Sequence, residues 1–168
     1  ALDLPDAGGP ITDFHEHDGE TLTATGVLAE SSNTGTVLIG QTMSDDQRYS
    51  MMRGFGFGQE TGIELPGESA GLLRSADQWQ GRDRYVTMFG QAYAITAMQE
   101  ASALATIANG GVRISPHIVK SWTNADGTVE VPDNSQPVQV MDAQAASQLL
   151  TMMESVVEDD LGTAGASK

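Results

Sequence analysis

The apolar residues of this chain recur at helical spacing in several stretches. The first stretch runs from Thr21 to Met43 and is interrupted by the polar run Ser31-Ser32-Asn33. In a second stretch, steps of three and four residues place five residues on one face of a helix: Met98, Ala101, Leu104, Ala105 and Ala108. Because alanine leaves room for a neighbouring backbone, this face predicts close packing against another element.

Two capping boxes predict where helices begin. Ser44 and Gln47 have the required spacing, in which the hydroxyl and the amide satisfy each other's free backbone N–H groups. They predict a short helix that ends at Gly54. Thr96 and Gln99 repeat the pattern directly before the alanine-rich helix.

The last third of the chain combines helix and strand signals. Asn109-Gly110-Gly111 ends the alanine-rich helix, and the segment IVKSWTNADGTVEV then has the pattern of a hairpin with its turn around residues 124–127. Asp142 is expected to cap a last helix, whose apolar side carries Leu149, Met153, Val156 and Val157. Helices dominate and strands are a minority, so the pattern predicts an α/β fold of the α+β type.

Composition narrows the classes of function. The 168 residues carry a net charge of −15 with only 8 basic residues, which argues against a nucleic-acid partner because phosphates need Lys and Arg. The absence of cysteine excludes a thiol nucleophile and a cysteine-based metal site. The length fits one domain or a large piece of one, and no apolar run reaches the roughly 18 residues of a membrane span.

Two short motifs are better explained by structure than by chemistry. His15-Glu16-His17 offers two imidazoles, but a metal site needs three or four convergent ligands, and the only other histidine is His117. We therefore interpret these histidines as exposed loop residues and predict neither a metal nor a cofactor. The run GFGFG at 54–58 follows a short helix instead of opening one, so a tight turn fits it better than a phosphate-binding loop.

The polar run Ser31-Ser32-Asn33 allows two interpretations. Ser and Asn are common where one helix ends and the next begins, because their side chains cap helices. The same hydroxyl and amide groups are also suited to handling protons and a peptide in a cleft. Spacing alone favours the helix junction.

Four longer blocks contain or follow this run: LTATGVLAESSNTG, RGFGFGQETGIELPGESAG, TMFGQAYAITAMQEASALATIANGG and SPHIV. In this order, and through nearly the whole chain, they resemble the transpeptidase domain of class B penicillin-binding proteins, which are serine acyl-transferases of the bacterial cell wall. The resemblance implies a penicillin-binding protein/serine β-lactamase-like fold, with a mainly antiparallel sheet covered by helices. It also implies a helical lobe whose S-x-N loop lines the cleft.

The active site of that family uses three motifs, S-x-x-K, S-x-N and K-T-G, and this chain has only the second. Its two lysines, Lys120 and Lys168, complete neither of the other motifs. The resemblance makes Ser31 the hydroxyl that relays a proton, and Asn33 the amide that holds both the substrate's peptide group and the catalytic lysine. Ser32 is then expected to cap the following helix.

We therefore expect residues 1–168 to be a partial transpeptidase domain, an internal fragment with S-x-x-K upstream and K-T-G downstream. The leading hypothesis is a piece of a peptidoglycan D,D-transpeptidase that crosslinks stem peptides ending in D-Ala-D-Ala through a serine acyl-enzyme and binds β-lactams. The fragment alone is predicted to be inactive. Missing sheet strands are expected to leave apolar surface bare.

The resemblance also implies a setting in cell division or cell-shape maintenance. Class B members are tethered by an N-terminal membrane helix, with the catalytic domain at the extracytoplasmic face of the bacterial cell membrane. They work beside a glycan-polymerising membrane partner. Two alternatives stay open: a β-lactam sensor or inactive scaffold on the same fold, and an acidic binding domain in which Ser31 and Asn33 only cap helices.

Overall fold

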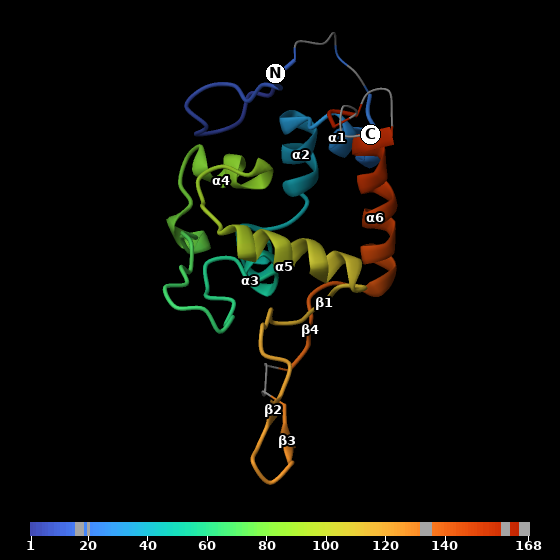
Figure 1. The fold of residues 1–168 in the computed structure, drawn as a ribbon. Helices are drawn as coiled ribbons and strands as arrows, with labels where there is room; N and C mark the ends of the chain where they lie inside the picture. Colours follow the sequence, from blue (N-terminus) through green and yellow to red (C-terminus); the bar gives the residue numbers. More distant parts are fainter. Residues whose placement is uncertain (16–18, 20, 132–135, 159–161, 165–168) are drawn as a thin grey trace. The chain divides into compact units, whose positions relative to one another are not determined.

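The structure is a computed structural model that describes residues 1–168 except 16–18, 20, 132–135, 159–161 and 165–168. The chain forms two compact units. Unit 1 comprises residues 1–50, 74–93 and 147–168, and unit 2 comprises residues 51–73 and 94–146. Helices dominate and the strands form short antiparallel pairs, so the predicted mixed fold class is confirmed (Figure 1).

Unit 1 is mostly helical. Helices α1 (Ala24–Ala29) and α2 (Asn33–Gly40) follow one another, and the helical stretch is interrupted at Ser31 and Ser32, as the pattern predicts. The unit also contains the start of α3 (Asp45–Gly54) and the part of α6 (Ala143–Glu158) that follows residue 146. The remaining elements are one short α-helix and two 3₁₀ turns: η1 (Ala76–Gln78), α4 (Asp83–Val86) and η2 (Thr87–Phe89).

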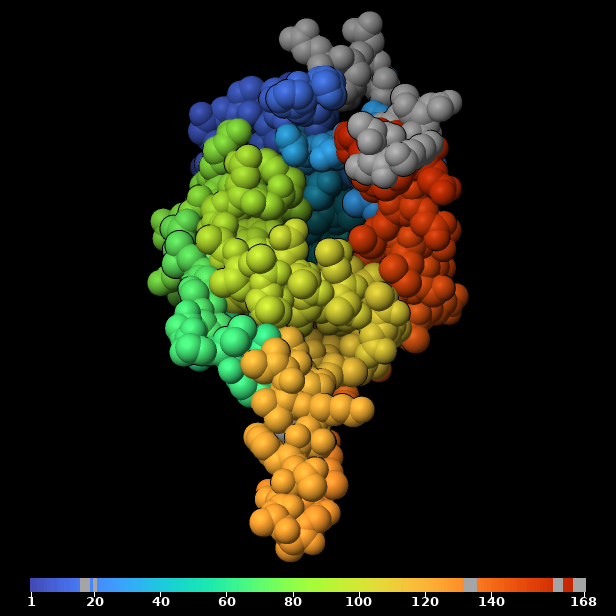
Figure 2. Space-filling model, in the orientation of Figure 1, coloured from blue at the N-terminus to red at the C-terminus, as the bar shows by residue number. Residues whose placement is uncertain are grey.

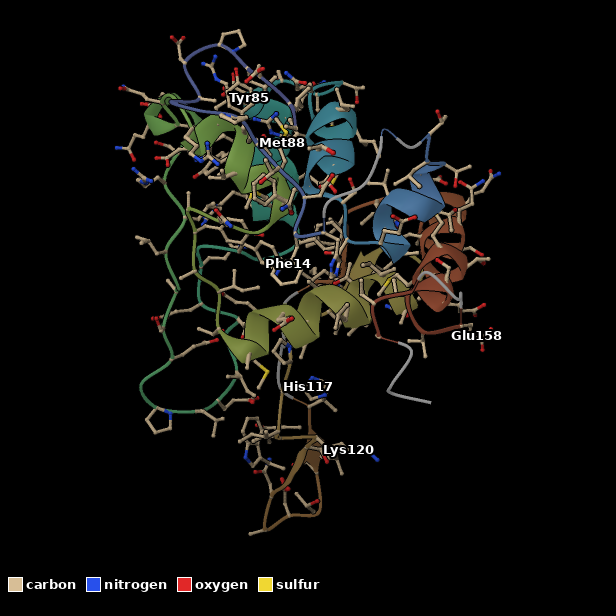
Figure 3. All side chains as sticks on the ribbon, turned by 90° about the horizontal axis from the view of Figure 1, so that it is seen from above. Phe14, Tyr85, Met88, His117, Lys120 and Glu158 are labelled. Carbon is tan, nitrogen blue, oxygen red and sulfur yellow. The ribbon has the colours of Figure 1, made fainter. Side chains whose placement is uncertain are left out.

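The core of unit 1 packs α2 against the segment 1–11 and the helical turns 83–89. Its buried members are Ala7, Ile11, Val37, Tyr85 and Val86. Met88 packs against this cluster on the side of Tyr85 (Figure 3). Leu2 and Ile11 pair as an antiparallel bridge with N···O distances of 2.8 and 2.9 Å, which closes the N-terminal loop. Because Val37 is completely buried, the core holds α2 firmly by its middle turn.

Unit 2 contains helix α5 (Ala97–Ala108) and two strand pairs. Strand β1 (Val112–Arg113) pairs with β4 (Val138–Gln139), and β2 (Trp122–Thr123) pairs with β3 (Val129–Glu130), both antiparallel. The β2–β3 pair is the predicted hairpin, and the Gly127 N–H donates to the Asn124 carbonyl across its turn at 2.9 Å. Side chains of the hairpin are exposed, Trp122 at 50% and Val129 at 62%, and Figure 2 shows the hairpin segment in space-filling form.

Both predicted capping boxes are confirmed. The Ser44 N–H donates to Gln47 Oε1 at 2.8 Å, and the Gln47 N–H donates to Ser44 Oγ at 3.2 Å. Thr96 and Gln99 make the same pair of bonds at the start of α5, with distances of 2.8 and 3.1 Å. Asp142 caps α6 as predicted, since its carboxylate accepts from the Gln144 N–H at 2.8 Å.

The predicted packing face of α5 is wrong. Met98 is half-buried, but the other members of that face are exposed: Ala101, Leu104, Ala105 and Ala108. The helix instead buries Gln99 and Thr106, which are 0% and 1% exposed. These two polar side chains are buried because both are hydrogen-bonded, Thr106 to the Ser102 carbonyl at 2.7 Å and Gln99 to several groups.

The loop at 61–68 of unit 2 is closed by one carboxylate. Glu68 accepts hydrogen bonds from the backbone N–H and hydroxyl of Thr61 and from the Gly62 N–H. These bonds, the Thr61 hydroxyl foremost, hold the pKa of Glu68 below its usual range. The block ETGIELPGE thus forms a defined loop even though its glycine and proline content excludes a helix.

Candidate functional site

The junction between α1 and α2 presents three neighbouring side chains in three different ways. Ser31 is exposed, and its backbone lies in the left-handed region at φ +55°, which is uncommon for a residue with a side chain. Ser32 is buried and caps α2 by accepting from the Gly35 N–H at 3.0 Å, as predicted. Asn33 opens α2 and is half-buried. The junction therefore leaves Ser31 exposed directly before the buried helix cap that Ser32 provides.

Asp13 fastens the segment before the first helix to the start of α2. Its carboxylate accepts from the Thr34 N–H at 2.9 Å, from the Thr34 hydroxyl at 2.6 Å and from the Ser32 hydroxyl at 3.2 Å. The Asn33 side-chain amide donates to the Thr12 carbonyl at 3.0 Å. A carboxylate also suits the positive end of a helix. These bonds bring the residues after Asp13 beside the polar run.

Gly35 allows the two helices to meet closely. A Cβ added there would lie only 2.6 Å from Val27 Cγ2, a side-chain atom of α1. Any larger residue would push the first turn of α2 away from α1. Gly35 is thus the second requirement, after the Ser32 cap, for the geometry of the junction.

A pocket of about 640 Å³ lies at this junction. Its walls come from three parts of unit 1, namely the segment before α1, the polar run, and residues just beyond α6: Phe14, His15, Glu30, Ser31, Ser32, Asn33, Gly162 and Thr163. The Thr163 N–H donates to the Ala29 carbonyl at 3.2 Å, which ties the last wall to the end of α1. Within the described part of the chain, the Ser31 hydroxyl has no hydrogen-bond partner.

The two residues that the sequence proposed for chemistry, Ser31 and Asn33, line the same pocket. The sequence missed other residues that shape it, among them Phe14 and Glu30. Phe14 is 90% exposed and its ring meets His15 edge-on at a centroid distance of 4.9 Å. Glu30 directly precedes Ser31, a position that carries no catalytic signal by itself. The only feature of the sequence that could have indicated Glu30 is its position directly before the S-x-N run.

The histidine motif is only partly described. His15 lines the pocket, whereas Glu16 and His17 lie outside the described residues. His117 belongs to unit 2, where it is exposed and its ring lies 3.3 Å from the Ser115 carbonyl (Figure 3). Among the described residues, no group of three or more potential ligands has the geometry to hold a metal ion.

The sequence of the chain matches a known family. The family model for the penicillin-binding protein transpeptidase domain matches residues 4–168. The chain belongs to this family. Its relatives place it with the class B penicillin-binding proteins, so the resemblance inferred from the sequence is confirmed.

Two curated proteins show how similar this transpeptidase chain is to its relatives in sequence. It is 39% identical over 153 residues to penicillin-binding protein PbpB of Mycolicibacterium smegmatis. This match covers 91% of the chain and 24% of that protein. It is 31% identical over 138 residues to stage V sporulation protein D of Bacillus subtilis. That match covers 81% of the chain and 21% of the sporulation protein. The chain therefore spans about a quarter of the length of the curated relatives it matches.

Solved structures share the fold of the transpeptidase chain. Penicillin-binding protein 3 of Mycobacterium tuberculosis in complex with aztreonam superimposes with a TM-score of 0.87 at 37% identity, covering 93% of this chain and 35% of that one. A peptidoglycan synthetase of Bifidobacterium adolescentis superimposes with a TM-score of 0.86 at 40% identity. The superposition covers 92% of this chain and 28% of the synthetase chain. The fold is that of penicillin-binding protein transpeptidase domains. In the described part of the chain, no helix combines the length and the apolar character needed to cross a membrane.

Proposed function

We propose that this chain supplies the S-x-N element of a peptidoglycan D,D-transpeptidase, which crosslinks stem peptides ending in D-Ala-D-Ala through a serine acyl-enzyme. The observation that carries the proposal is the pocket at the α1–α2 junction. It holds the Ser31 hydroxyl and the Asn33 amide together, while the buried Ser32 hydroxyl serves as the helix cap. A purely capping role for the run would require only Ser32.

The chemistry needs groups of these types. A serine nucleophile is weak until a base removes its proton, and the departing amine must receive a proton. In the proposed mechanism the Ser31 hydroxyl relays this proton. Asn33, whose amide already donates one N–H to the Thr12 carbonyl, offers its second N–H and its Oδ1 acceptor to the substrate's peptide group and to the catalytic lysine. Neither the nucleophile of S-x-x-K nor the K-T-G strand occurs in these 168 residues.

The proposal extends to the whole protein. Residues 1–168 form part of the transpeptidase domain, and the S-x-x-K and K-T-G motifs come from polypeptide outside them. β-Lactam binding is supported by the relatives, since penicillin-binding protein 3 of Mycobacterium tuberculosis has been solved with aztreonam and with ampicillin. A membrane-tethered parent with its catalytic domain outside the cytoplasmic membrane, beside a glycan-polymerising partner, completes the proposal.

Labelling with a fluorescent penicillin tests it. The polypeptide that includes the flanking reading frame is expected to be labelled, whereas the isolated 168 residues are expected to remain unlabelled for lack of a nucleophile. In the longer polypeptide, Ser31→Ala should reduce acyl transfer by at least about a hundredfold, the range of a lost proton-transfer group. Ser50→Ala, which removes an exposed hydroxyl from α3, is the matched control.

Labelling of the isolated chain would contradict the proposal, and so would full acyl transfer by Ser31→Ala. A longer polypeptide that is labelled but transfers its acyl group to no amine would instead favour the β-lactam sensor.

A further inference from the structure

Glu30 is the one carboxylate among the described walls of the pocket, and it is incompletely bonded. It stands at the end of α1, immediately before Ser31. Its Oε1 atom is buried from solvent and has no hydrogen-bond partner among the described residues. A buried carboxylate oxygen without a donor is unfavourable, because the water it lost has not been replaced. The Glu30 carboxylate therefore has no hydrogen-bond donor within the described part of the chain.

The described cations of unit 1 are engaged at other places. Each arginine of the unit has its own partners: Arg48 and Arg84 with Asp45, Arg74 with Asp83, and Arg82 with the carbonyls of Ala7 and Gly9. The described walls of the pocket contain no lysine or arginine. The pocket thus has a negative group next to the Ser31 hydroxyl and no fixed positive group among those walls.

We propose that Glu30 binds the cationic amino group of the acceptor stem peptide beside Ser31, an inference that rests on the proposed transpeptidase function. An alkyl amine is protonated near neutral pH and carries three N–H donors. These donors suit a carboxylate and a hydroxyl that line one pocket. Of the two carboxylate oxygens, only Oε1 is buried without a partner, so the amine is expected to bind Oε2 from the pocket.

The acceptor is consumed in a balanced acyl transfer. The ammonium held by Glu30 gives up one proton, and its nitrogen then forms a bond to the carbonyl carbon of the acyl-enzyme while the ester C–O bond to serine breaks. The serine oxygen takes up a proton, and the nitrogen of the new amide keeps one. The net release is a single proton to solvent. Glu30 raises the local concentration of the amine, and the exposed Phe14 ring offers an apolar wall to its carbon chain.

The test compares acceptors in the polypeptide that includes the flanking reading frame. Its acyl-enzyme is formed from a thioester donor and partitioned between water and an amine, either a stem tripeptide with a lysine third residue or hydroxylamine, which is uncharged at pH 8. Glu30→Gln should lower the aminolysis-to-hydrolysis ratio for the tripeptide about tenfold or more, the effect of one charge-assisted hydrogen bond. The ratio for hydroxylamine should fall far less. Glu154→Gln, an exposed change on α6, is the matched control.

An unchanged tripeptide ratio in Glu30→Gln would overturn the inference. A second measurement is independent of acylation: NMR titration of the wild-type polypeptide with the tripeptide and with its side-chain N-acetyl form. Weaker binding of the acetylated form, and of the free tripeptide to Glu30→Gln, supports the role of Glu30 even if no acyl-enzyme forms. Equal binding of both forms contradicts it even if the transpeptidase function holds.

Discussion

Ser31 combines an exposed side chain with a backbone that is unfavourable for it. Its φ of +55° falls in the left-handed region, where the Cβ of any residue except glycine crowds the following carbonyl. A helix junction built only for stability would place glycine or asparagine here. Because strain of this kind persists mainly where the side chain is needed, the conformation supports a role for the Ser31 hydroxyl.

Replacing Ser31 by glycine should therefore stabilise the chain while removing the proposed relay. We expect Ser31→Gly to raise the free energy of unfolding by up to about 1 kcal/mol, because the left-handed strain disappears. Ser31→Ala removes the same hydroxyl and keeps the strained Cβ, so it should bring no such gain. Urea unfolding of both variants, followed by circular dichroism, measures the difference. A glycine variant less stable than the alanine variant would refute the argument from strain.

The sequence identified the residues of the site that belong to a motif, and missed those that depend on folding. Ser31 and Asn33 were predicted because S-x-N stands among recognisable blocks. Asp13 was not, since its partners lie about twenty residues away and only the folded chain brings its carboxylate to the start of α2. Glu30 was missed for a similar reason, because an unbonded carboxylate can be recognised only when its surroundings are known.

At the scale of elements, Gln99 connects the start of α5 to the loop that precedes it. Its Oε1 accepts from the Thr96 N–H at 2.8 Å, which is half of the capping box. Its Nε2 donates to the carbonyls of Gln59 at 2.7 Å and Ala70 at 2.9 Å. The side chain is fully buried, so one amide both caps the helix and holds the 59–70 loop of unit 2.

The two roles of Gln99 can be separated by substitution. Gln99→Glu keeps the acceptor for the Thr96 N–H but loses the donors and places a carboxylate against carbonyl oxygens, so it should destabilise unit 2 by about 3 kcal/mol. Thr96→Ala removes only the cap and should cost about 1 kcal/mol. Hydrogen exchange should show faster exchange in residues 59–70 for Gln99→Glu and near α5 for Thr96→Ala. Identical exchange patterns in the two variants would show that the roles are not separable.

Local signals predicted the elements better than their packing. Both capping boxes, the hairpin turn and the Asp142 cap depend on residues within four positions of one another, and all four occur as predicted. The predicted buried face of α5 does not occur, because the spacing of its alanines does not determine which side of the helix packs against other elements. The helix turns its polar Gln99 and Thr106 inward, where hydrogen bonds satisfy them, and exposes Leu104 at 49%.

Across the whole molecule, apolar groups are exposed on both units. Leu38 on α2 is 56% exposed and Val131 after β3 is 72% exposed. The surface is also strongly acidic, since 8 basic residues can neutralise at most 8 of the 23 carboxylates. Charge repulsion keeps such a chain in solution but opposes its compact state.

Added salt should therefore stabilise the chain by screening this repulsion. We expect the urea midpoint to rise between low salt and 0.5 M NaCl, where the Debye length falls to about 4 Å. In a Trp122→Phe background, the buried Trp79 is the only tryptophan and reports the unfolding of unit 1 by fluorescence.

A charge-reduced variant tests the cause of this stabilisation. Asp3→Asn, Glu60→Gln and Glu154→Gln remove three exposed negative charges that take part in no ion pair among the described residues. In the same Trp122→Phe background, this triple variant should start from a higher urea midpoint and gain less from salt, because less repulsion remains to be screened. A midpoint that is insensitive to salt, or an equal gain in both proteins, would mean that the ion pairs of Arg48, Arg74 and Arg84 outweigh the net charge.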